Sequence, residues 1–290
     1  MDLAHAPIGI YDSGVGGLTV WLALKQLVKQ DLLYYGDTAH IPYGDKKKEQ
    51  ILFYSHNITR FLKQQGARVI VAACNTSSAL ALPSLQLTAG VPVFGMIEPA
   101  VKKASSVTKN RRIGLIATVG TVQSGSYQKM FQQLAPDISL YAQPCPKLVP
   151  LIEAGKIDGP EIYSVLRQYL DPLKKQNIDT LILGCTHYPF ILQPIRDIIG
   201  SDVQIVDPAW QLAMDVRDWL REHGFADILR PTNDQFWTSG NPQEFQRKAS
   251  FFIGSQIKTV KYHQPPEDLP SKIQSVLGEL VPGWRGDDDQ

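Results

Sequence analysis

The sequence predicts an α/β protein with two similar domains, each a parallel sheet covered by helices, facing each other across a central cleft with pseudo-twofold symmetry. Two observations support this prediction. Short apolar runs of strand length alternate with helical stretches over most of the 290 residues. Continuous apolar strands joined by helical crossovers are typical of parallel sheets that are buried on both faces. The same order of elements then restarts near residue 111, and each half contains an apolar run that ends in a cysteine.

In the first half, apolar runs predict strands, and the stretches between them show helical periodicity. Glycines at positions 14, 16 and 17 predict the turn after the first strand. In chain order, the expected elements are strand 7–12, helix 18–30, strand 32–37, helix 46–65, strand 66–74, helix 76–87 and strand 91–97.

The second half repeats the plan, and a tail follows it. The expected elements are strand 111–118, helix 121–134, strand 138–143, helix 160–177, strand 178–185, helix 189–199, strand 203–207, helix 208–223, strand 235–240, helix 242–251 and strand 257–262. We assign residues 1–98 and 208–290 to the first domain and 99–207 to the second, so that the tail packs back on the first domain. The final segment, RGDDDQ (285–290), is expected to be disordered.

Composition narrows the class of protein. The formal net charge is +1, from 29 basic and 28 acidic residues, so we expect neither a nucleic-acid-binding nor a membrane-binding surface. Three cysteines in a chain of this length do not form a disulfide framework and indicate a reducing compartment. The N-terminus lacks the pattern of a signal peptide, and no apolar run approaches the ~20 residues needed to span a bilayer. The sequence therefore predicts a cytoplasmic protein.

Two cysteines occupy equivalent places in the two halves. Cys74 in VAACNTSSA (71–79) and Cys185 in LILGCTHYP (181–189) each end an apolar run and precede polar residues. Parallel α/β sheets bind ligands at the carboxyl ends of their strands, so facing domains would bring both thiols to one cleft. A helix N-terminus and nearby N–H donors favour the thiolate, and we expect a pKa below the usual ~8.5. Cys145 lies between two prolines without a polar cluster and is expected to be a buried structural cysteine.

Two thiols on opposite sides of a small substrate can do what one cannot. One removes a proton from a carbon atom, and the other returns a proton from the opposite face, which inverts that carbon. Other predicted strand ends supply hydroxyl, amide and carboxylate groups that could hold an ammonium and carboxylates. These residues are Asp12, Ser13, Asp37, Thr38, Tyr43, Gly44, Thr118 and Thr121.

Three alternatives use the same residues differently. DSGVGGLT (12–19) follows a strand and opens a helix, as a dinucleotide loop does, but Thr19 stands where that pattern needs glycine. Cys74, Cys185 and His187 could ligate zinc, although the usual paired spacing is absent. A cysteine hydrolase would use one thiol with a histidine as base, and His187 could serve only Cys185.

Six sequence blocks resemble those of the glutamate racemases, in order and with ordinary spacing, from about residue 8 to about residue 210. The blocks are GIYDSGVGGLTV, YYGDTAHIPYG, VAACNTSSA, LIATVGTV, LVPLIEAG and LILGCTHYP. Wider relatives include aspartate and hydantoin racemases and a decarboxylase. The D-S-G-V-G-G and I-P-Y-G blocks are similar to those of the glutamate enzymes in particular.

The resemblance implies an isomerase that interconverts L- and D-glutamate by two bases, with no cofactor and no metal. Cys74 and Cys185 would be the two acid/base thiols, Asp12 would assist Cys74, and His187 with Glu153 would assist Cys185. Substrate would be bound by Asp12, Ser13, Tyr43, Gly44, Asn75, Thr76, Thr186 and His187, with Thr118 and Thr121 as carboxylate contacts. The resemblance also implies a homodimer that supplies D-glutamate for bacterial peptidoglycan and cell-wall formation. The choice of glutamate over aspartate rests on the resemblance alone.

Overall fold

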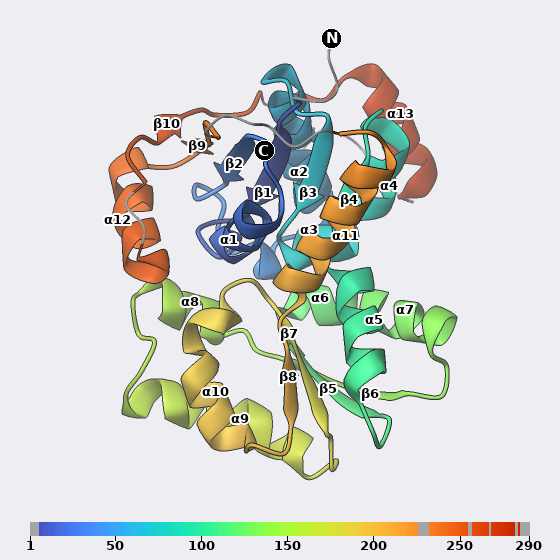
Figure 1. The fold of residues 1–290 in the computed structure, drawn as a ribbon, viewed down its shortest axis with the longest axis vertical. Helices are drawn as coiled ribbons and strands as arrows, with labels where there is room; N and C mark the ends of the chain where they lie inside the picture. The colour runs from blue at the N-terminus through green and yellow to red at the C-terminus, as the bar shows by residue number, and fades with distance from the viewer. Residues whose placement is uncertain (1–5, 226–231, 255–256, 267, 282–283, 285–290) are drawn as a thin grey trace.

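Two parallel sheets form the framework of the molecule, which confirms the predicted fold class (Figure 1). The structure, a computed structural model, describes residues 6–225, 232–254, 257–266, 268–281 and 284. Within these residues the first sheet has the strand order β10-β9-β2-β1-β3-β4, and the second has the order β6-β5-β7-β8. The first sheet with its helices makes the upper part of Figure 1, and the second makes the lower part.

The first sheet takes strands from two distant parts of the chain. Its strands are β1 (Ile8–Asp12), β2 (Leu32–Gly36), β3 (Val69–Ala72), β4 (Val93–Gly95), β9 (Gln235–Thr238) and β10 (Lys261–Tyr262). The tail strand β9 pairs with β2, in parallel, so the tail completes this sheet. Its other elements are α1 (Leu18–Leu27), η2 (Tyr43–Asp45), α2 (Lys48–Gln64), α3 (Asn75–Leu80), α4 (Leu82–Thr88), α11 (Pro208–Glu222), α12 (Pro242–Ile253) and α13 (Ser271–Leu280).

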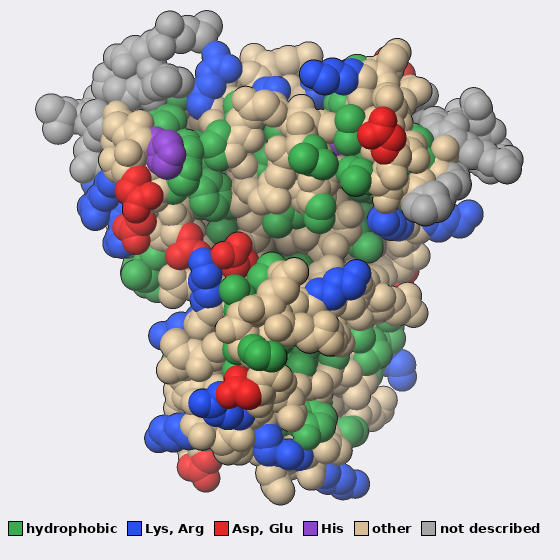
Figure 2. Space-filling view, turned by 90° about the vertical axis from the view of Figure 1, so that its right-hand side faces the viewer, with side chains coloured by type: hydrophobic (Ala, Val, Ile, Leu, Met, Phe, Trp, Pro, Cys, Tyr) green, Lys and Arg blue, Asp and Glu red, His purple; other side chains and the backbone are tan. Residues whose placement is uncertain are grey.

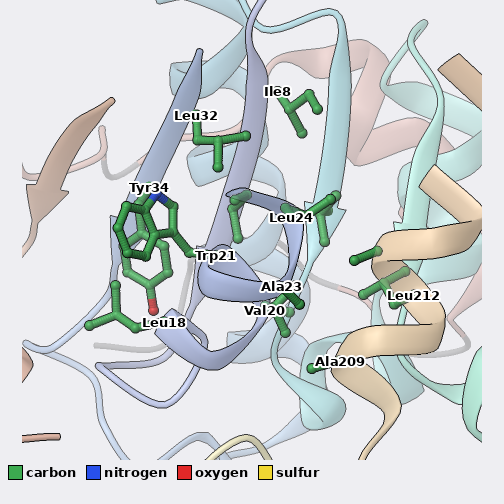
Figure 3. Packing of buried hydrophobic residues seen from close by; sticks show 14 of the residues in the cluster. Ile8, Leu18, Val20, Trp21, Ala23, Leu24, Leu32, Tyr34, Ala209 and Leu212 are labelled. Carbon is green, nitrogen blue, oxygen red and sulfur yellow. The ribbon is translucent and has the colours of Figure 1, made fainter. Parts of the chain in front are cut away.

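Each face of the first sheet has its own core because successive strand residues point to opposite sides. Ile8 and Ile10 of β1 belong to one cluster of buried residues, and Tyr11 belongs to the other. In Figure 3 the first cluster joins β1 and β2 to α1 and α11. In the same cluster the Trp21 ring packs edge-on against Phe236 of β9, with ring centroids 5.4 Å apart. The whole of β1 is therefore buried, as its unbroken apolar run predicts.

The second sheet is continuous in the chain. Its strands are β5 (Arg112–Ala117), β6 (Ser139–Pro144), β7 (Thr180–Gly184) and β8 (Gln204–Val206). One core lies under the helices α8 (Leu148–Glu153), α9 (Pro160–Lys174) and α10 (Leu192–Ile199), and the other lies under α5 (Ile97–Val107) and α7 (Ser126–Leu134). Two short elements, α6 (Val119–Gln123) and η3 (Tyr188–Ile191), follow the ends of β5 and β7. The domain boundaries at 98/99 and 207/208 stay a prediction.

Several predicted elements are corrected. The single helices expected over 76–87 and 121–134 are each two helices; the first breaks at Ala81 ahead of Pro83, and the second breaks at Gly125, whose φ is +66°. The helix expected over 189–199 begins as the 3-10 turn η3, and the strand expected over 257–262 shortens to β10. Helices α5, α8 and α13 were not predicted. The segment 285–290, expected to be disordered, lies outside the described residues.

The distribution of surface charge and the lengths of the helices relate to possible binding of nucleic acid or membrane. On the face shown in Figure 2, charged side chains of both signs are scattered and form no continuous patch. Among the described helices, none combines the length and apolar character needed to cross a membrane.

Candidate active site

A small cavity lies where the carboxyl ends of strands from both sheets meet. It has a free volume of about 10 Å³, which is close to the space that one water molecule occupies. Both predicted catalytic cysteines line it, and so do the predicted substrate-binding residues except Asp12; of the two predicted carboxylate contacts, Thr118 lines it and Thr121 does not. The lining residues are Ser13, Pro42, Tyr43, Gly44, Cys74, Asn75, Thr76, Thr118, Val149, Cys185, Thr186 and His187.

Cys74 is held at the boundary between β3 and α3. Its backbone is extended, with φ −67° and ψ 123°, and it caps α3. The expected lowering of its thiol pKa is wrong. Burial, followed by the negative charge of Asp12, raises the pKa of Cys74 to about 12, although the N–H groups of Ser77 and Thr76 oppose the shift. Buried in this way beside Asp12, Cys74 is a neutral thiol at neutral pH.

Asp12 lies beside the cavity at the end of β1 and is fully buried. One carboxylate oxygen accepts a hydrogen bond from the Gly14 N–H at 3.0 Å, and the other accepts one from the Thr186 hydroxyl at 3.1 Å. Burial raises the pKa of this carboxyl, while the charge of His187 and the loop N–H groups oppose the rise. Through its bond with Thr186, the residue after Cys185, Asp12 connects the first domain to the second.

Cys185 stands at the end of β7 beside a chain of charged groups. Its Sγ is 3.8 Å from Nδ1 of His187, and Nε2 of His187 is 2.7 Å from a Glu153 oxygen. Burial alone would lower the pKa of His187, but its bonds to Cys185 and Glu153 raise the pKa to about 10. Burial would raise the pKa of Glu153, yet the bonds with His187 and Lys248 lower it to about 2. An imidazolium paired with a carboxylate therefore faces the Cys185 thiol.

A hydrogen bond to Asp37 fixes the position of the Tyr43 side chain. The Tyr43 hydroxyl donates to Asp37 at 2.5 Å, and the other Asp37 oxygen accepts from Ser239 at 2.6 Å. Asp37 does not line the cavity, so it supports a lining residue instead of meeting a ligand there. Thr38, the other predicted residue at this strand end, bonds to Thr238 of β9 at 2.6 Å.

The far wall carries hydroxyl and amide groups. The Thr76 and Thr118 hydroxyls lie 3.0 Å apart across the two domains, and Thr121 lies 2.9 Å from Thr118. The Asn75 Oδ1 atom accepts from the Tyr127 hydroxyl at 2.8 Å. Its Nδ2 group is buried and has no hydrogen-bond partner among the described residues. Because an unpaired buried donor costs about 1–3 kcal/mol, Asn75 is suited to meet an acceptor on a ligand.

Comparison with known proteins decides the family. A model of the Asp/Glu/hydantoin racemase family matches residues 22–216. A glutamate racemase of Geobacter metallireducens is 41% identical over 261 residues, which cover 87% of this chain and 94% of the relative. The chain belongs to the Asp/Glu/hydantoin racemase family.

Solved structures agree with this assignment to the racemase family. A glutamate racemase from Bacillus anthracis has a TM-score of 0.86 at 38% identity and covers 90% of this chain and 98% of its own. A glutamate racemase from Francisella tularensis, solved in complex with D-glutamate, has a TM-score of 0.84 at 32% identity, with 90% and 98% coverage. The resemblance to glutamate racemases and the racemase class are thereby confirmed.

The glycines of the DSGVGG block have a structural reason in this racemase-family chain. A Cβ atom on Gly16 would lie 2.5 Å from the Thr186 hydroxyl and 2.7 Å from His187 Nδ1. The loop therefore lies directly against Thr186 and His187 of the second domain, with no room for a side chain at position 16. Within the described residues, no three His, Cys, Asp or Glu side chains are grouped as metal ligands.

Gly16→Ala is expected to lower turnover by about 10²-fold, because it pushes Thr186 and His187 away from the cavity and small misplacements of reacting groups cost that much. Steady-state racemisation kinetics provide the measurement. Gly278→Ala is the matched control, since its Cβ would meet open space in α13. Normal turnover by Gly16→Ala would show that the close contact is dispensable.

His187→Asn is expected to destabilise the protein in a pH-dependent way. The pKa of His187 rises from 6.5 to about 10 on folding, so its stabilising contribution is complete below pH 6.5 and is lost as the pH rises toward 10. The difference in unfolding free energy between wild type and variant should shrink by up to about 1.4 kcal/mol per pH unit across that range. Urea denaturation at several pH values measures it, and a constant difference would contradict the charged pair.

Missed at the sequence level were Pro42 and Val149, which line the cavity, and two supporting residues from the tail. Ser239, after β9, fixes Asp37, and Lys248 of α12 lies 2.8 Å from Glu153. Both come from the tail, far from the motifs that contain their partners. The third cysteine lies where the sequence predicts, since Cys145 is buried in the core under α8 and α9 and does not line the cavity.

Proposed function

We propose that the protein interconverts L- and D-glutamate without a cofactor, using Cys74 and Cys185 as the two acid/base groups. The observation that carries this proposal is that the two thiols reach one cavity from the strand ends of two different sheets. The glutamate racemases to which the chain is similar support the substrate, and the Francisella tularensis relative is solved with D-glutamate.

In each turnover one cysteine acts as thiolate and removes the α-proton, and the other acts as thiol and donates a proton to the opposite face. The thiols exchange these roles when the direction reverses. The α-proton of an amino acid is a weak acid, so the site must stabilise the negative charge that develops on the substrate. The Asn75 amide and the Thr76 and Thr118 hydroxyls are donors already fixed in place around the cavity.

Because the pKa of Cys74 is raised, we propose that substrate binding also helps to deprotonate this thiol. Burial and the charge of Asp12 keep this thiol protonated. The ammonium group of an amino acid, held beside Asp12, adds a positive charge that lowers the pKa of the thiol. The thiolate then forms when substrate is present, and on the Cys185 side the His187 imidazolium supplies the positive charge.

The cavity of about 10 Å³ is closed around too little space for an amino acid, which is several times larger than a water molecule. In this proposal the strand ends of the two sheets separate to admit substrate and close again around it. Closure excludes water and strengthens every charge interaction at the reacting carbon. The wider proposal, which the family resemblance implies, is a cytoplasmic homodimer that supplies D-glutamate for bacterial peptidoglycan.

The test is the optical rotation of L-glutamate incubated with purified protein that has been dialysed against a chelator and given no cofactor. Decay of the signal to zero is expected. L-aspartate is run in parallel, and decay with aspartate alone would keep the two-thiol chemistry but reassign the substrate. No decay with either amino acid would overturn the proposal.

A further inference from the structure

We propose that Lys248 is a positioning residue that couples closure of the two domains to proton transfer at Cys185. This inference rests on the proposed racemase function and deepens it. It adds to the site a side chain that lies outside residues 22–216, the part of the chain that the family model matches.

Lys248 links the two domains by a charged contact. It belongs to α12, which packs with α1 and β9 of the first domain, whereas Glu153 ends α8 of the second domain. The Lys248 ammonium lies 2.8 Å from Oε2 of Glu153. In Figure 1 the lower end of α12 approaches α8 across the boundary between the upper and lower parts.

The contact continues to a reacting thiol. Glu153 uses its other oxygen, Oε1, to bond Nε2 of His187 at 2.7 Å, and Nδ1 of His187 faces Cys185. Lys248 therefore fixes the carboxylate that orients the imidazolium beside Cys185. The side chain of Glu153 is only 14% exposed and that of Lys248 is 24% exposed, so this ion pair is shielded more than an ordinary surface pair.

Opening of the cavity must disturb this chain of contacts. Substrate cannot enter until the strand ends of the two sheets separate, and the bond between Lys248 and Glu153 spans that separation. In the open form Glu153 loses its partner from the first domain and the His187 ring loses a fixed acceptor. In the closed form the ammonium returns, so Cys185 meets a correctly placed imidazolium only when the domains are closed. Among the described residues no comparable chain of bonds joins Lys248 to Cys74, so we expect the effect on proton transfer at Cys185 and not at Cys74.

Lys248→Met is expected to lower kcat by about tenfold, with a smaller effect on KM, because the misplaced group acts during proton transfer. Lys248→Arg restores the charge and should recover most of the activity. Glu244→Gln is the matched control. Glu244 lies 3.2 Å from the same ammonium but is 54% exposed on α12 and is not among the residues that line the cavity, so its variant should keep normal turnover.

Isotope effects with α-deuterated L- and D-glutamate separate positioning from general damage. One enantiomer loses its α-proton to Cys185 and the other loses it to Cys74. In Lys248→Met the barrier at Cys185 grows, so the isotope effect on kcat/KM should rise for one enantiomer and fall for the other. Unchanged kcat, unchanged isotope effects, or equal losses in Lys248→Met and Lys248→Arg would each overturn the inference. Failure of the wild-type protein to racemise glutamate would instead overturn the proposed function, and this inference with it.

Discussion

Cys74→Ser and Cys185→Ser are each expected to abolish racemisation, with a loss of about 10³-fold or more. General acid–base groups contribute about 10²–10⁴-fold to a reaction, and an alcohol is a far weaker acid than a thiol, so serine cannot take either role. Both cysteines are nearly fully buried in the cavity wall, and serine is slightly smaller than cysteine, so the fold should survive. Racemisation from both enantiomers, followed by polarimetry, gives the measurement.

Cys145→Ser is the matched control for both variants. Cys145 is also buried, and its Sγ donates to the Gln143 carbonyl at 3.4 Å, a bond that a serine hydroxyl can replace. Turnover should stay near normal in this variant. Near-normal turnover by Cys74→Ser or Cys185→Ser would refute the two-thiol mechanism, and exchange of the α-proton of a single enantiomer by either variant would support it.

Asp12→Asn is expected to lower kcat by about 10²-fold and to raise KM less. The carboxylate holds the Gly14 N–H and the Thr186 hydroxyl, and its charge acts on the Cys74 thiol. An amide keeps the shape but removes the charge that balances the substrate ammonium beside Cys74, so proton transfer should suffer more than binding.

Full steady-state kinetics in both directions test this expectation, with the melting temperature as a check on the fold. Asp179→Asn is a suitable comparison, since Asp179 accepts bonds from Thr108, Lys109 and Asn110 far from the cavity. It should affect stability and leave kcat unchanged. An Asp12→Asn variant with normal kcat and raised KM would mean that Asp12 only binds the ammonium group.

The chemistry of the strand ends could be predicted from the sequence because parallel strands bring their carboxyl ends to one edge. The residues after β1, β3 and β7 meet there whatever the details of packing, so Ser13, Cys74 and Cys185 line one cavity. Continuous apolar runs likewise identified the strands of both sheets. Helix α8 was missed because Pro150 interrupts a short stretch, and α5 was missed because it lies at the assigned domain boundary.

What the sequence did not reveal depends on contacts between distant segments. Lys248 and Ser239 enter the site only because β9 pairs with β2 and carries the tail back to the first domain. The pKa of Cys74 was expected to fall because a strand end beside a helix suggests open N–H donors. The closed domains bury the thiol and place Asp12 beside it, and these two effects outweigh the donors.

The place of β9 in the first sheet has a consequence for synthesis on the ribosome. All strands of the second sheet lie between residues 112 and 206. The first sheet is complete only after strands 235–238 and 261–262 have been synthesised. The domain that starts later can therefore finish folding earlier, while β2 emerges with one edge uncovered. That edge is a site for wrong pairing until the tail arrives. Ribosomal stalling before residue 235 should yield a nascent chain whose second domain resists protease and whose first domain does not.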